Sequence, residues 1–459
     1  MGLLVLQSLA LLALCCWSYS SAELLQSSKE EMGSIISRTN NGAISFPLIN
    51  IHSDASPFRS LNSTRSSRIT EWLKSDIHRQ QALFQQKESP SQTEAEGEVP
   101  LASGAAIDNG NYIIKLGFGT PAQMIYTMVD TGSDIAWIPC NSCRNCKTHQ
   151  SFEAQKSSTF KLMSCSSDQC GQVKGICMRG NKCAFGEGYS DGSEVKALLS
   201  SDELTTGENG KVHISRFIFG CSNARRGNLE KAPGLVGLGR GTLSFLSQTE
   251  PMYGKVFSYC LPSIDSMSFS GTLSLGKGSL SSTQGLRFTP LLPNPAGFAT
   301  YYYVGLVGIS VGNERFFMPK ESSQPSSNGG GTVIDSGTVI TRLVDPLYCQ
   351  VRDSFRRQVK STMIDPVMFL DTCYRIPSGG NFMVPGITLH FQGGLDLALP
   401  RESVLITLDD TGSICLAFAS AGPGPEAISV IGNYQQQKLR IVYDVPGSRL
   451  GIVLENCDR

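Results

Sequence analysis

Short apolar stretches separated by turn residues make up most of the chain after residue 100. They are rich in Val, Ile, Phe and Tyr, which is typical of β-strands. The clearest of them predict strands over residues 111–117, 123–130, 212–220, 301–311 and 438–444. Because the 47 glycines favour frequent turns, the pattern as a whole predicts an all-β protein.

The region before residue 100 has a different pattern. Its apolar residues recur at close to helical spacing: Ile69, Trp72, Leu73, Ile77 and Phe84. Residues 88–98 then form a polar, acidic linker, and residues 23–99 contain no cysteine. A helical segment and an acidic linker ahead of a cysteine-rich β region predict a propeptide over residues 23–100, cleaved near residues 88–106. A small permanent N-terminal domain is the alternative.

The first 22 residues are typical of a signal peptide. An apolar run from Leu3 to Trp17 is followed by small residues that end at Ala22. The run is short for a membrane span, and no later stretch is long and apolar enough for one. We expect residues 1–22 to be removed and the protein to be secreted without a membrane anchor, with the vacuole as the alternative destination. A buried N-terminal helix is the other interpretation of this run.

One short motif occurs in both halves of the chain. Residues 128–133, Met-Val-Asp-Thr-Gly-Ser, recur as residues 333–338, Val-Ile-Asp-Ser-Gly-Thr. Each copy is followed by an apolar stretch with glycine, at residues 234–239 and at residues 429–433. An internal repeat of this kind indicates two copies of one β unit. The join falls near residues 275–287.

The repeat predicts an N-terminal lobe over residues 101–280 and a C-terminal lobe over residues 281–459, each with one aspartate, Asp130 or Asp335, at the same position. The two apolar residues before each aspartate place it at the end of a buried strand, and the following glycine lets the backbone turn tightly. Two neighbouring carboxyl groups do not readily both ionise, so one acts as an acid and the other as a base. Such a pair can activate water without a metal or a cofactor.

Charge and histidine content exclude other classes of function. Lys plus Arg and Asp plus Glu both number 39, so nothing indicates a nucleic-acid partner. None of the five histidines lies in a recognisable nucleophile motif, which argues against a serine or cysteine hydrolase. They are His52, His78, His149, His213 and His390.

These motifs make the chain similar to pepsin-type aspartic endopeptidases, and more closely to the plant nepenthesin-like and nucellin-like group. The resemblance covers nearly everything after residue 100, and residues 46–86 resemble the propeptides of that group. No long saposin-like insert interrupts the second half, unlike in typical vacuolar plant enzymes. The motifs that carry the resemblance are residues 119–121, 130–134, 219–221, 234–241, 257–260, 335–338 and 431–437, with Trp137.

The resemblance implies a bilobal pepsin-like fold of two β-barrel-like lobes, with the active site in the cleft between them. It implies an acid endopeptidase that acts on polypeptides, most simply as a monomer, and is made as a zymogen inhibited by its own propeptide. A catalytically silent inhibitor or binding protein of the same fold is the alternative. Relatives of that kind lack an intact aspartate pair, whereas both motifs are intact here.

The resemblance also assigns roles around Asp130 and Asp335, which would hold the nucleophilic water. The residues supporting the pair would be Thr131, Gly132, Ser133, Ser336, Gly337 and Thr338. Among these, the hydroxyls of Ser133 and Thr338 would bond the outer carboxylate oxygens. Thr131 and Ser336 would join the two loops.

The resemblance and the sequence single out three further residues. Tyr189 matches the tyrosine of the flap, a β-hairpin that closes over bound peptide. Trp137 matches the tryptophan that supports this tyrosine, although an ordinary core position explains it equally well. Asp134 adds a third carboxylate next to the pair.

Thirteen of the fifteen cysteines follow the predicted signal peptide. Twelve are disulfide candidates: Cys140, Cys143, Cys146, Cys165, Cys170, Cys177, Cys183, Cys221, Cys260, Cys373, Cys415 and Cys457. A zinc site at residues 140–146 is the alternative, but an exported chain favours disulfides, and the related plant group has a cysteine-rich insert here. In the second half we expect Cys373–Cys415 and Cys260–Cys457, which leaves Cys349 as a buried free thiol.

The predicted propeptide is basic, with six Lys or Arg against three Asp or Glu between His52 and Lys87. A basic segment over an acidic cleft would inhibit at neutral pH and be released as carboxyl groups take up protons. A plain mixture of solvated charges is the alternative. The one glycosylation sequon, at Asn62, also lies in this region.

Overall fold

The computed structural model describes residues 44–59, 64–85, 101–103, 112–144, 146, 150–188, 194–206, 212–226, 232–264, 271–281, 284–376, 382–409 and 412–457. The predicted signal peptide, the acidic linker at residues 88–98, the sequon at Asn62 and the flap candidate Tyr189 lie outside these residues.

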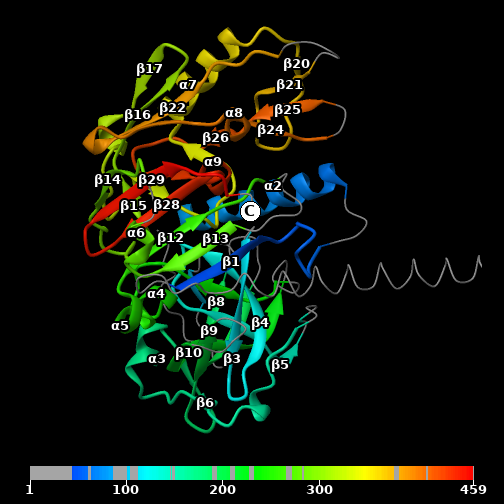
Figure 1. The fold of residues 1–459 in the computed structure, drawn as a ribbon, viewed down its shortest axis with the longest axis vertical. Helices are drawn as coiled ribbons and strands as arrows, with labels where there is room; N and C mark the ends of the chain where they lie inside the picture. Colours follow the sequence, from blue (N-terminus) through cyan, green and yellow to red (C-terminus); the bar gives the residue numbers. More distant parts are fainter. Residues whose placement is uncertain are drawn as a thin grey trace, which may run out of the picture.

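Strands dominate the structure and form two lobes, one below and one above a central sheet in Figure 1. The lower lobe consists of β2 (Leu101–Ser103), β3 (Tyr112–Phe118), β4 (Gln123–Asp130), β5 (Trp137–Arg144), β6 (Lys161–Leu162), β7 (Ile176–Met178), β8 (Lys182–Gly188), β9 (Glu194–Thr206), β10 (Val212–Arg226) and β11 (Leu235–Gly237), with the short helices α3 (Asp168–Gln172), α4 (Phe245–Gln248) and α5 (Glu250–Tyr253). We refer to it as the first lobe.

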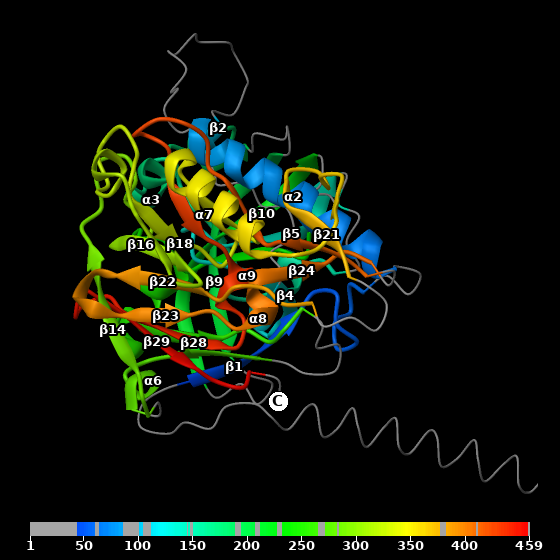
Figure 2. The same cartoon turned by 90° about the horizontal axis from the view of Figure 1, so that it is seen from above.

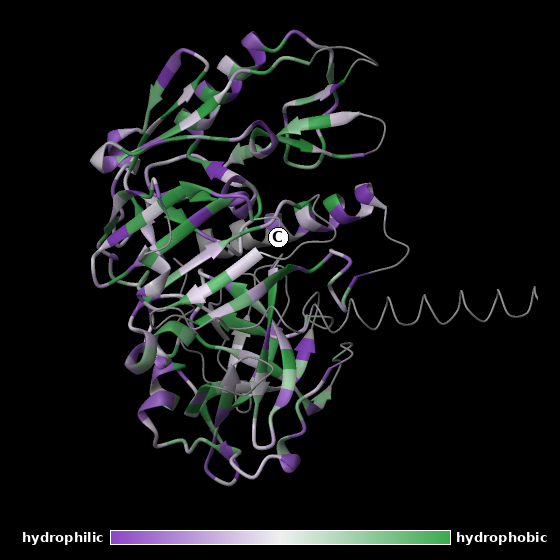
Figure 3. Ribbon diagram, in the orientation of Figure 1, coloured by the Kyte–Doolittle hydropathy of each residue, from purple (hydrophilic) through white to green (hydrophobic). Residues whose placement is uncertain are grey.

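The upper lobe, which we refer to as the second lobe, has the longer helix α7 (Asp345–Gln358) and the short α8 (Arg401–Val404) and α9 (Asn433–Gln436). Its strands are β15 (Tyr303–Val304), β16 (Leu306–Val311), β17 (Glu314–Phe317), β18 (Thr332–Ile334), β19 (Thr341–Leu343), β20 (Met363–Ile364), β21 (Cys373–Arg375), β22 (Ile387–Phe391), β23 (Asp396–Ala398), β24 (Leu405–Thr407), β25 (Ser413–Leu416), β26 (Phe418–Ser420) and β27 (Ser429–Ile431). Apolar residues concentrate on the strands of both lobes (Figure 3).

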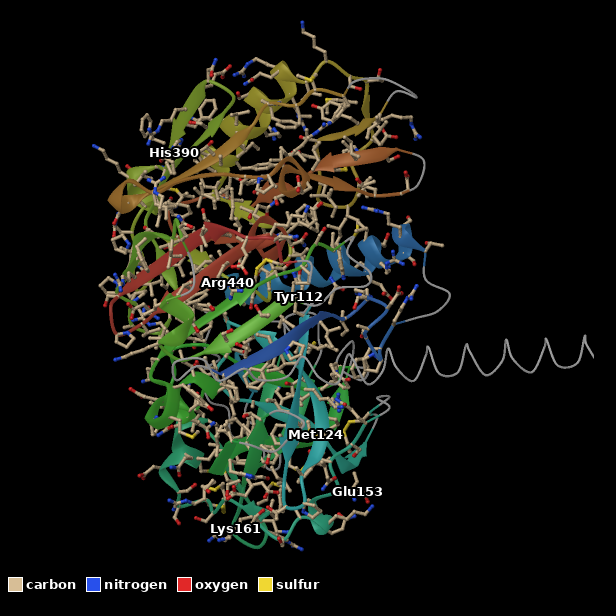
Figure 4. All side chains as sticks on the ribbon, viewed as in Figure 1. Tyr112, Met124, Glu153, Lys161, His390 and Arg440 are labelled. Carbon is tan, nitrogen blue, oxygen red and sulfur yellow. A yellow bond between two sulfur atoms is a disulfide. The ribbon has the colours of Figure 1, made fainter. Side chains whose placement is uncertain are left out.

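An antiparallel central sheet joins the lobes. Its strand order is β1 (Ile44–Asn50), β13 (Gly271–Leu275), β12 (Val256–Cys260), β28 (Leu439–Asp444), β29 (Arg449–Leu454) and β14 (Arg287–Leu292). Helix α6 (Gly278–Ser281) lies between β13 and β14 along the chain. Tyr112 and Arg440 mark this level in Figure 4. The Tyr112 hydroxyl donates to the Pro262 carbonyl oxygen at 2.8 Å, and Arg440 pairs with Glu455.

The N-terminal segment, by which we mean residues 44–85, contacts both lobes. Its strand β1 pairs with β13 and, through its last two residues, with β3. Its helix α2 (Arg65–Gln85) lies between the lobes and crosses them in the view from above (Figures 1 and 2). The helix matches the spacing of apolar residues seen in the sequence.

Six disulfides involve the twelve candidate cysteines. Four brace the first lobe: Cys140–Cys221, Cys143–Cys146, Cys165–Cys177 and Cys170–Cys183. Cys373–Cys415 links β21 to β25, and Cys260–Cys457 ties the central sheet to the end of the chain. Both pairs expected in the second half are therefore present. Cys349 is free, but it is partly exposed at the edge of the main core rather than buried, because it lies on α7, which covers the core from outside.

Within the described ranges, no helix is long and apolar enough to cross a membrane. The same residues contain no group of three or more His, Cys, Asp and Glu side chains placed to hold a metal ion.

Candidate active site

Each aspartate of the repeated motif lies at the end of a paired strand: Asp130 is the last residue of β4, and Asp335 directly follows β18. In the first lobe, β11 runs parallel to β4 and places Gly237 opposite Asp130. In the second lobe, β27 runs parallel to β18 in the same way, and the Asp335 amide donates to the Ile431 carbonyl oxygen at 3.1 Å. Each parallel pair is extended by an antiparallel strand, β5 or β19. The two apolar stretches of the repeat therefore hold the two aspartate loops.

The two carboxylates are buried, and each accepts an equivalent hydrogen bond from a glycine amide. Asp130 and Asp335 are each 1% exposed. The Gly132 amide donates to Asp130 Oδ1 and the Gly337 amide donates to Asp335 Oδ1, both at 3.0 Å. A glycine amide two residues along thus binds each carboxylate in the same way.

The two loops bind each other through their hydroxyl residues. The Thr131 amide donates to Ser336 Oγ at 3.1 Å, and the Ser336 amide donates to Thr131 Oγ1 at 2.9 Å. Thr131 Oγ1 also lies 3.4 Å from Asp335 Oδ1, to which it donates. These reciprocal bonds bring residues 205 positions apart in the chain into one site.

The outer carboxylate oxygens of Asp130 and Asp335 differ in their hydrogen bonds. Thr338 Oγ1 donates to Asp335 Oδ2 at 2.6 Å. Ser133 Oγ, the equivalent hydroxyl, is buried but forms no hydrogen bond, so the expected Ser133 contact with Asp130 is absent. The physical reason lies in the side chains. The second Cβ substituent of threonine restricts its χ1 rotamer, whereas serine has no such restriction.

Asp134 explains the glycines of the loop that follows β11. Its carboxylate accepts from the Gly241 amide at 2.8 Å and from Thr300 Oγ1 at 2.7 Å. A Cβ atom at Gly239 or Gly241 would collide with this carboxylate. Burial, together with the nearby negative charge of Asp130, raises the pKa of Asp134. The third carboxylate therefore ties the first aspartate loop to Thr300 at the edge of the second lobe.

Trp137 lies at the start of β5 and is fully buried. It packs in a cluster with Met128 and Leu235, which lie on the two strands that hold Asp130, and with Ile51 of the N-terminal segment. The Arg225 guanidinium lies over its ring, 5.1 Å from the centroid. Trp137 is thus a core residue of the site wall. Its relation to Tyr189 falls outside the described residues.

Helix α2 packs on the residues that follow the second aspartate loop. Its apolar side chains Ile69, Trp72 and Leu73 are buried in one cluster with Val339 and Ile340. The cluster also includes Tyr434 and Cys415 of the second lobe. The helix therefore lies directly over the chain that leaves Asp335.

Asp76 of α2 forms the main polar contact of this interface. Its Oδ1 accepts from the Val339 amide at 2.6 Å and the Ile340 amide at 3.3 Å. Its Oδ2 accepts from Arg342 Nε at 3.2 Å and from Arg342 Nη2 at 2.9 Å. The side chains of Asp76 and Arg342 are 0% and 4% exposed. Sequence charge counts suggested a basic segment over an acidic cleft, but this contact has the opposite polarity, because local position rather than total charge decides a buried pair.

Taken together, the two loops bring two buried carboxylates into one hydrogen-bonded site. Two negative charges this close together repel each other, so one carboxyl group is favoured in the neutral form beside an ionised one. The aspartic proteases are the standard example of this behaviour. The arrangement can therefore supply an acid and a base side by side.

Comparison with known proteins covers both lobes. The family model described as "Xylanase inhibitor N-terminal" matches residues 112–277, and the one described as "Xylanase inhibitor C-terminal" matches residues 301–453. Aspartyl protease AED3 of Arabidopsis thaliana is 38% identical over 431 residues, which cover 91% of this chain and 93% of that protein. Aspartic proteinase nepenthesin-1 of Nepenthes gracilis is 36% identical over 356 residues, or 76% and 78% of the two chains.

Solved structures show the same fold at lower identity. The crystal structure of edgp has a TM-score of 0.60 at 21% identity and covers 74% of this chain and 91% of its own. Conglutin gamma from lupine seeds has a TM-score of 0.59 at 19% identity, with coverage of 74% and 90%. Both support the all-β bilobal architecture.

Proposed function

Because this chain belongs to the nepenthesin-like group of plant pepsin-type aspartic proteases, we propose that it is an active aspartic endopeptidase whose catalytic pair is Asp130 and Asp335. The observation that carries the proposal is the set of reciprocal bonds between Thr131 and Ser336, which holds two intact carboxylates in one buried site. An inhibitor or binding protein of the same fold is the competing proposal, consistent with the descriptions of the matching family models.

The proposed reaction is peptide-bond hydrolysis in polypeptides. The ionised member of the pair takes a proton from water, whose oxygen forms a bond to the peptide carbonyl carbon, while the protonated member donates to the carbonyl oxygen. The carbon–nitrogen bond then breaks as the amine nitrogen takes up the proton that the pair received from water. A hydroxyl of the tetrahedral intermediate returns its proton to the other carboxylate, which leaves a carboxylic acid and an amine and restores the pair. The hydrogen bonds from Gly132, Gly337 and Thr338 hold the carboxylates in place during these transfers.

We further propose that the N-terminal segment is the inhibitory part of a propeptide. Its contacts support this role, since Ile51 packs beside Trp137 in the first lobe and α2 covers Val339 in the second. Secretion after loss of residues 1–22 and cleavage near residues 88–106 complete the proposed maturation. The mature protein would act as a monomer.

The proposal is tested on the full-length protein after acid processing. We expect the processed protein to cleave denatured globin at mildly acidic pH and to be inhibited by a statine-type transition-state analogue. Asp130→Asn and Asp335→Asn should each lower kcat by about 10²–10⁴-fold, the range for loss of general acid–base catalysis.

Asp134→Asn is the matched control, because it changes a neighbouring buried carboxylate outside the pair. Asp134→Asn should keep most of the wild-type activity, whereas the other two variants lose it. Activity that survives in both Asp130→Asn and Asp335→Asn would overturn the assignment. A folded, processed protein with no cleavage of any denatured substrate would favour an inhibitor or binding protein.

A further inference from the structure

The internal repeat places Arg342 at the position equivalent to Trp137. In the first lobe, β11 places Leu235 opposite both Met128 and Trp137. In the second lobe, β27 places Val430 opposite both Val333 and Arg342. The same wall position next to each aspartate therefore carries an indole in one lobe and a guanidinium in the other.

Arg342 and two peptide amides form a built pocket for a carboxylate. The guanidinium binds one oxygen of Asp76 through two nitrogens, and the Val339 and Ile340 amides bind the other. A planar guanidinium with adjacent backbone N–H groups matches the geometry of a carboxylate. Val339 immediately follows Thr338, which is bonded to Asp335. The pocket is therefore only a few residues from the proposed catalytic pair.

Among the described residues, Asp76 is the only carboxylate that forms an ion pair with Arg342. Its other contacts are the Phe369 ring, 4.1 Å from the guanidinium carbon, and the Ser420 carbonyl oxygen at 3.4 Å from Nη1. Tyr348 is a further titratable group near it. Departure of α2 would remove the Asp76 carboxylate from Arg342 and from the Val339 amide, and a guanidinium beside a peptide N–H group favours an anionic partner.

We propose that this pocket is a substrate subsite for an acidic side chain, so that in the processed enzyme an Asp or Glu carboxylate of the substrate takes the place of Asp76. The inference rests on the proposed endopeptidase function and adds a substrate class to it. Trp72 and Leu73, within one helical turn of Asp76, fill the apolar surface beside Val339. A peptide chain bound along this surface brings its own side chains to the same places.

The test uses pairs of fluorogenic peptides that differ only in Asp or Asn at one position, scanned over the four positions on each side of the scissile bond. Amidated C termini ensure that only a side chain can supply the carboxylate. At pH 5, we expect kcat/KM for the Asp peptide to exceed that for the Asn peptide by at least about 10-fold at one position, as for a charge-assisted bond. The ratio should fall as the pH is lowered through about 4, where the substrate carboxylate takes up a proton.

Arg342→Gln should bring this ratio close to one, whatever happens to the absolute rates. The variant is made together with Asp76→Asn, so that the precursor does not bury an unpaired carboxylate during folding. Asp76→Asn alone is the matched control, because its processed form has the wild-type sequence. Arg342→Lys should give an intermediate ratio, since lysine keeps the charge but not the forked geometry.

Two results would overturn the inference. One is a ratio below about 2 at every position in the wild-type enzyme, and the other is a preference for Asp that persists in Arg342→Gln. Both require cleavage of the Asn peptides, so they leave the endopeptidase function intact. Failure to cleave either member of any pair would instead count against the proposed function.

Discussion

The two aspartate loops are copies of one unit, yet they obtain their neighbouring carboxylate in different ways. The first loop contains its own, since Asp134 lies four residues after Asp130 and accepts from the Gly241 amide. In the second loop the equivalent position is Val339, whose amide donates to Asp76 from the N-terminal segment. The first loop therefore has its additional carboxylate within the first half of the chain, whereas the second loop receives one from a separate segment.

The same contrast holds for the walls beside the loops. Trp137 makes the first wall apolar, and Ile51 of the N-terminal segment packs there. Arg342 makes the second wall basic, and Asp76 binds there. The comparison indicates that duplication preserved the loops and their reciprocal bonds while the adjacent surfaces diverged in chemistry.

The largest expected effect concerns the pH at which the N-terminal segment is released. The His52 ring lies against Trp72 in a tilted arrangement, with ring centroids 5.3 Å apart, and its buried Nε2 has no hydrogen-bond partner. Burial, and then the positive charge of Arg68, lower the pKa of His52 to about 4. Between pH 6.5 and 4 the released segment therefore binds a proton that the docked segment does not. Docking should weaken by up to about 300-fold over this range.

His52→Gln should remove most of this weakening. Burial raises the pKa of Asp76, which acts in the opposite sense because it lets the docked form take up a proton more readily. The contribution of His52 is thus the difference in the pH dependence of docking between the protein with His52 and the His52→Gln variant. Hydrogen exchange of residues 44–85 measures it, in an Asp130→Asn background that prevents cleavage. Equal pH dependence with and without His52 would show that this side chain does not control release.

The next prediction compares the hydroxyl groups of Thr338 and Ser133. Thr338→Ala removes the donor to Asp335 Oδ2 and should lower kcat/KM by about 10- to 100-fold, because hydrogen bonds to charged groups contribute about 1.5–3 kcal/mol. Ser133→Ala should change kcat/KM by less than about 3-fold, since Ser133 Oγ has no partner. Steady-state kinetics on one peptide measure both.

Thr338→Ser is the control and should fall between the wild type and Thr338→Ala, because serine keeps the hydroxyl but not the β-methyl group that restricts its rotamer. A loss in Ser133→Ala as large as that in Thr338→Ala would mean that the two half-sites are equivalent during the reaction, contrary to the comparison.

The smallest effect concerns Asp134. Its charge and that of Asp130 repel each other, which contributes to its raised pKa. Asp134→Asn keeps the size of the side chain but removes the charge. We expect the acid limb of the pH–kcat/KM profile to move slightly to lower pH, because a neighbouring negative charge disfavours ionisation of a carboxyl group. An unchanged profile would show that Asp134 only braces the Gly241 loop.

The sequence predicted those parts of the molecule that leave a local or repeated pattern. The strand predicted at residues 123–130 is β4 to the residue, and apolar spacing located α2. The strand predicted over residues 301–311 is instead two strands, β15 and β16, which differ in partner. Gly305 lies between them, where the chain passes so close to Gln392 that a Cβ would collide.

Contacts between distant residues left no such pattern. Asp76 and Arg342 are 266 positions apart, and each looks like an ordinary solvated charge in its own helix or strand. The sequence also does not show that Ser133 Oγ lacks a hydrogen bond, because a serine hydroxyl can adopt several rotamers and only the structure shows which one it takes. The motif thus located the aspartate loops, but the chemistry of the walls required the fold.

Strand β1 has a consequence for how long the processed enzyme can last. Ile44, Phe46 and Leu48 are buried in the main core, and burial of three such side chains contributes about 5–9 kcal/mol. This is comparable with the whole stability of a typical domain. If processing removes β1, the mature molecule persists because it unfolds slowly, held partly by Cys260–Cys457, and not because its fold is strongly favoured. Once unfolded, the mature chain would lack β1, the strand that pairs with β13, and would not refold readily. Maturation would then be irreversible, and the mature enzyme would have a limited lifetime.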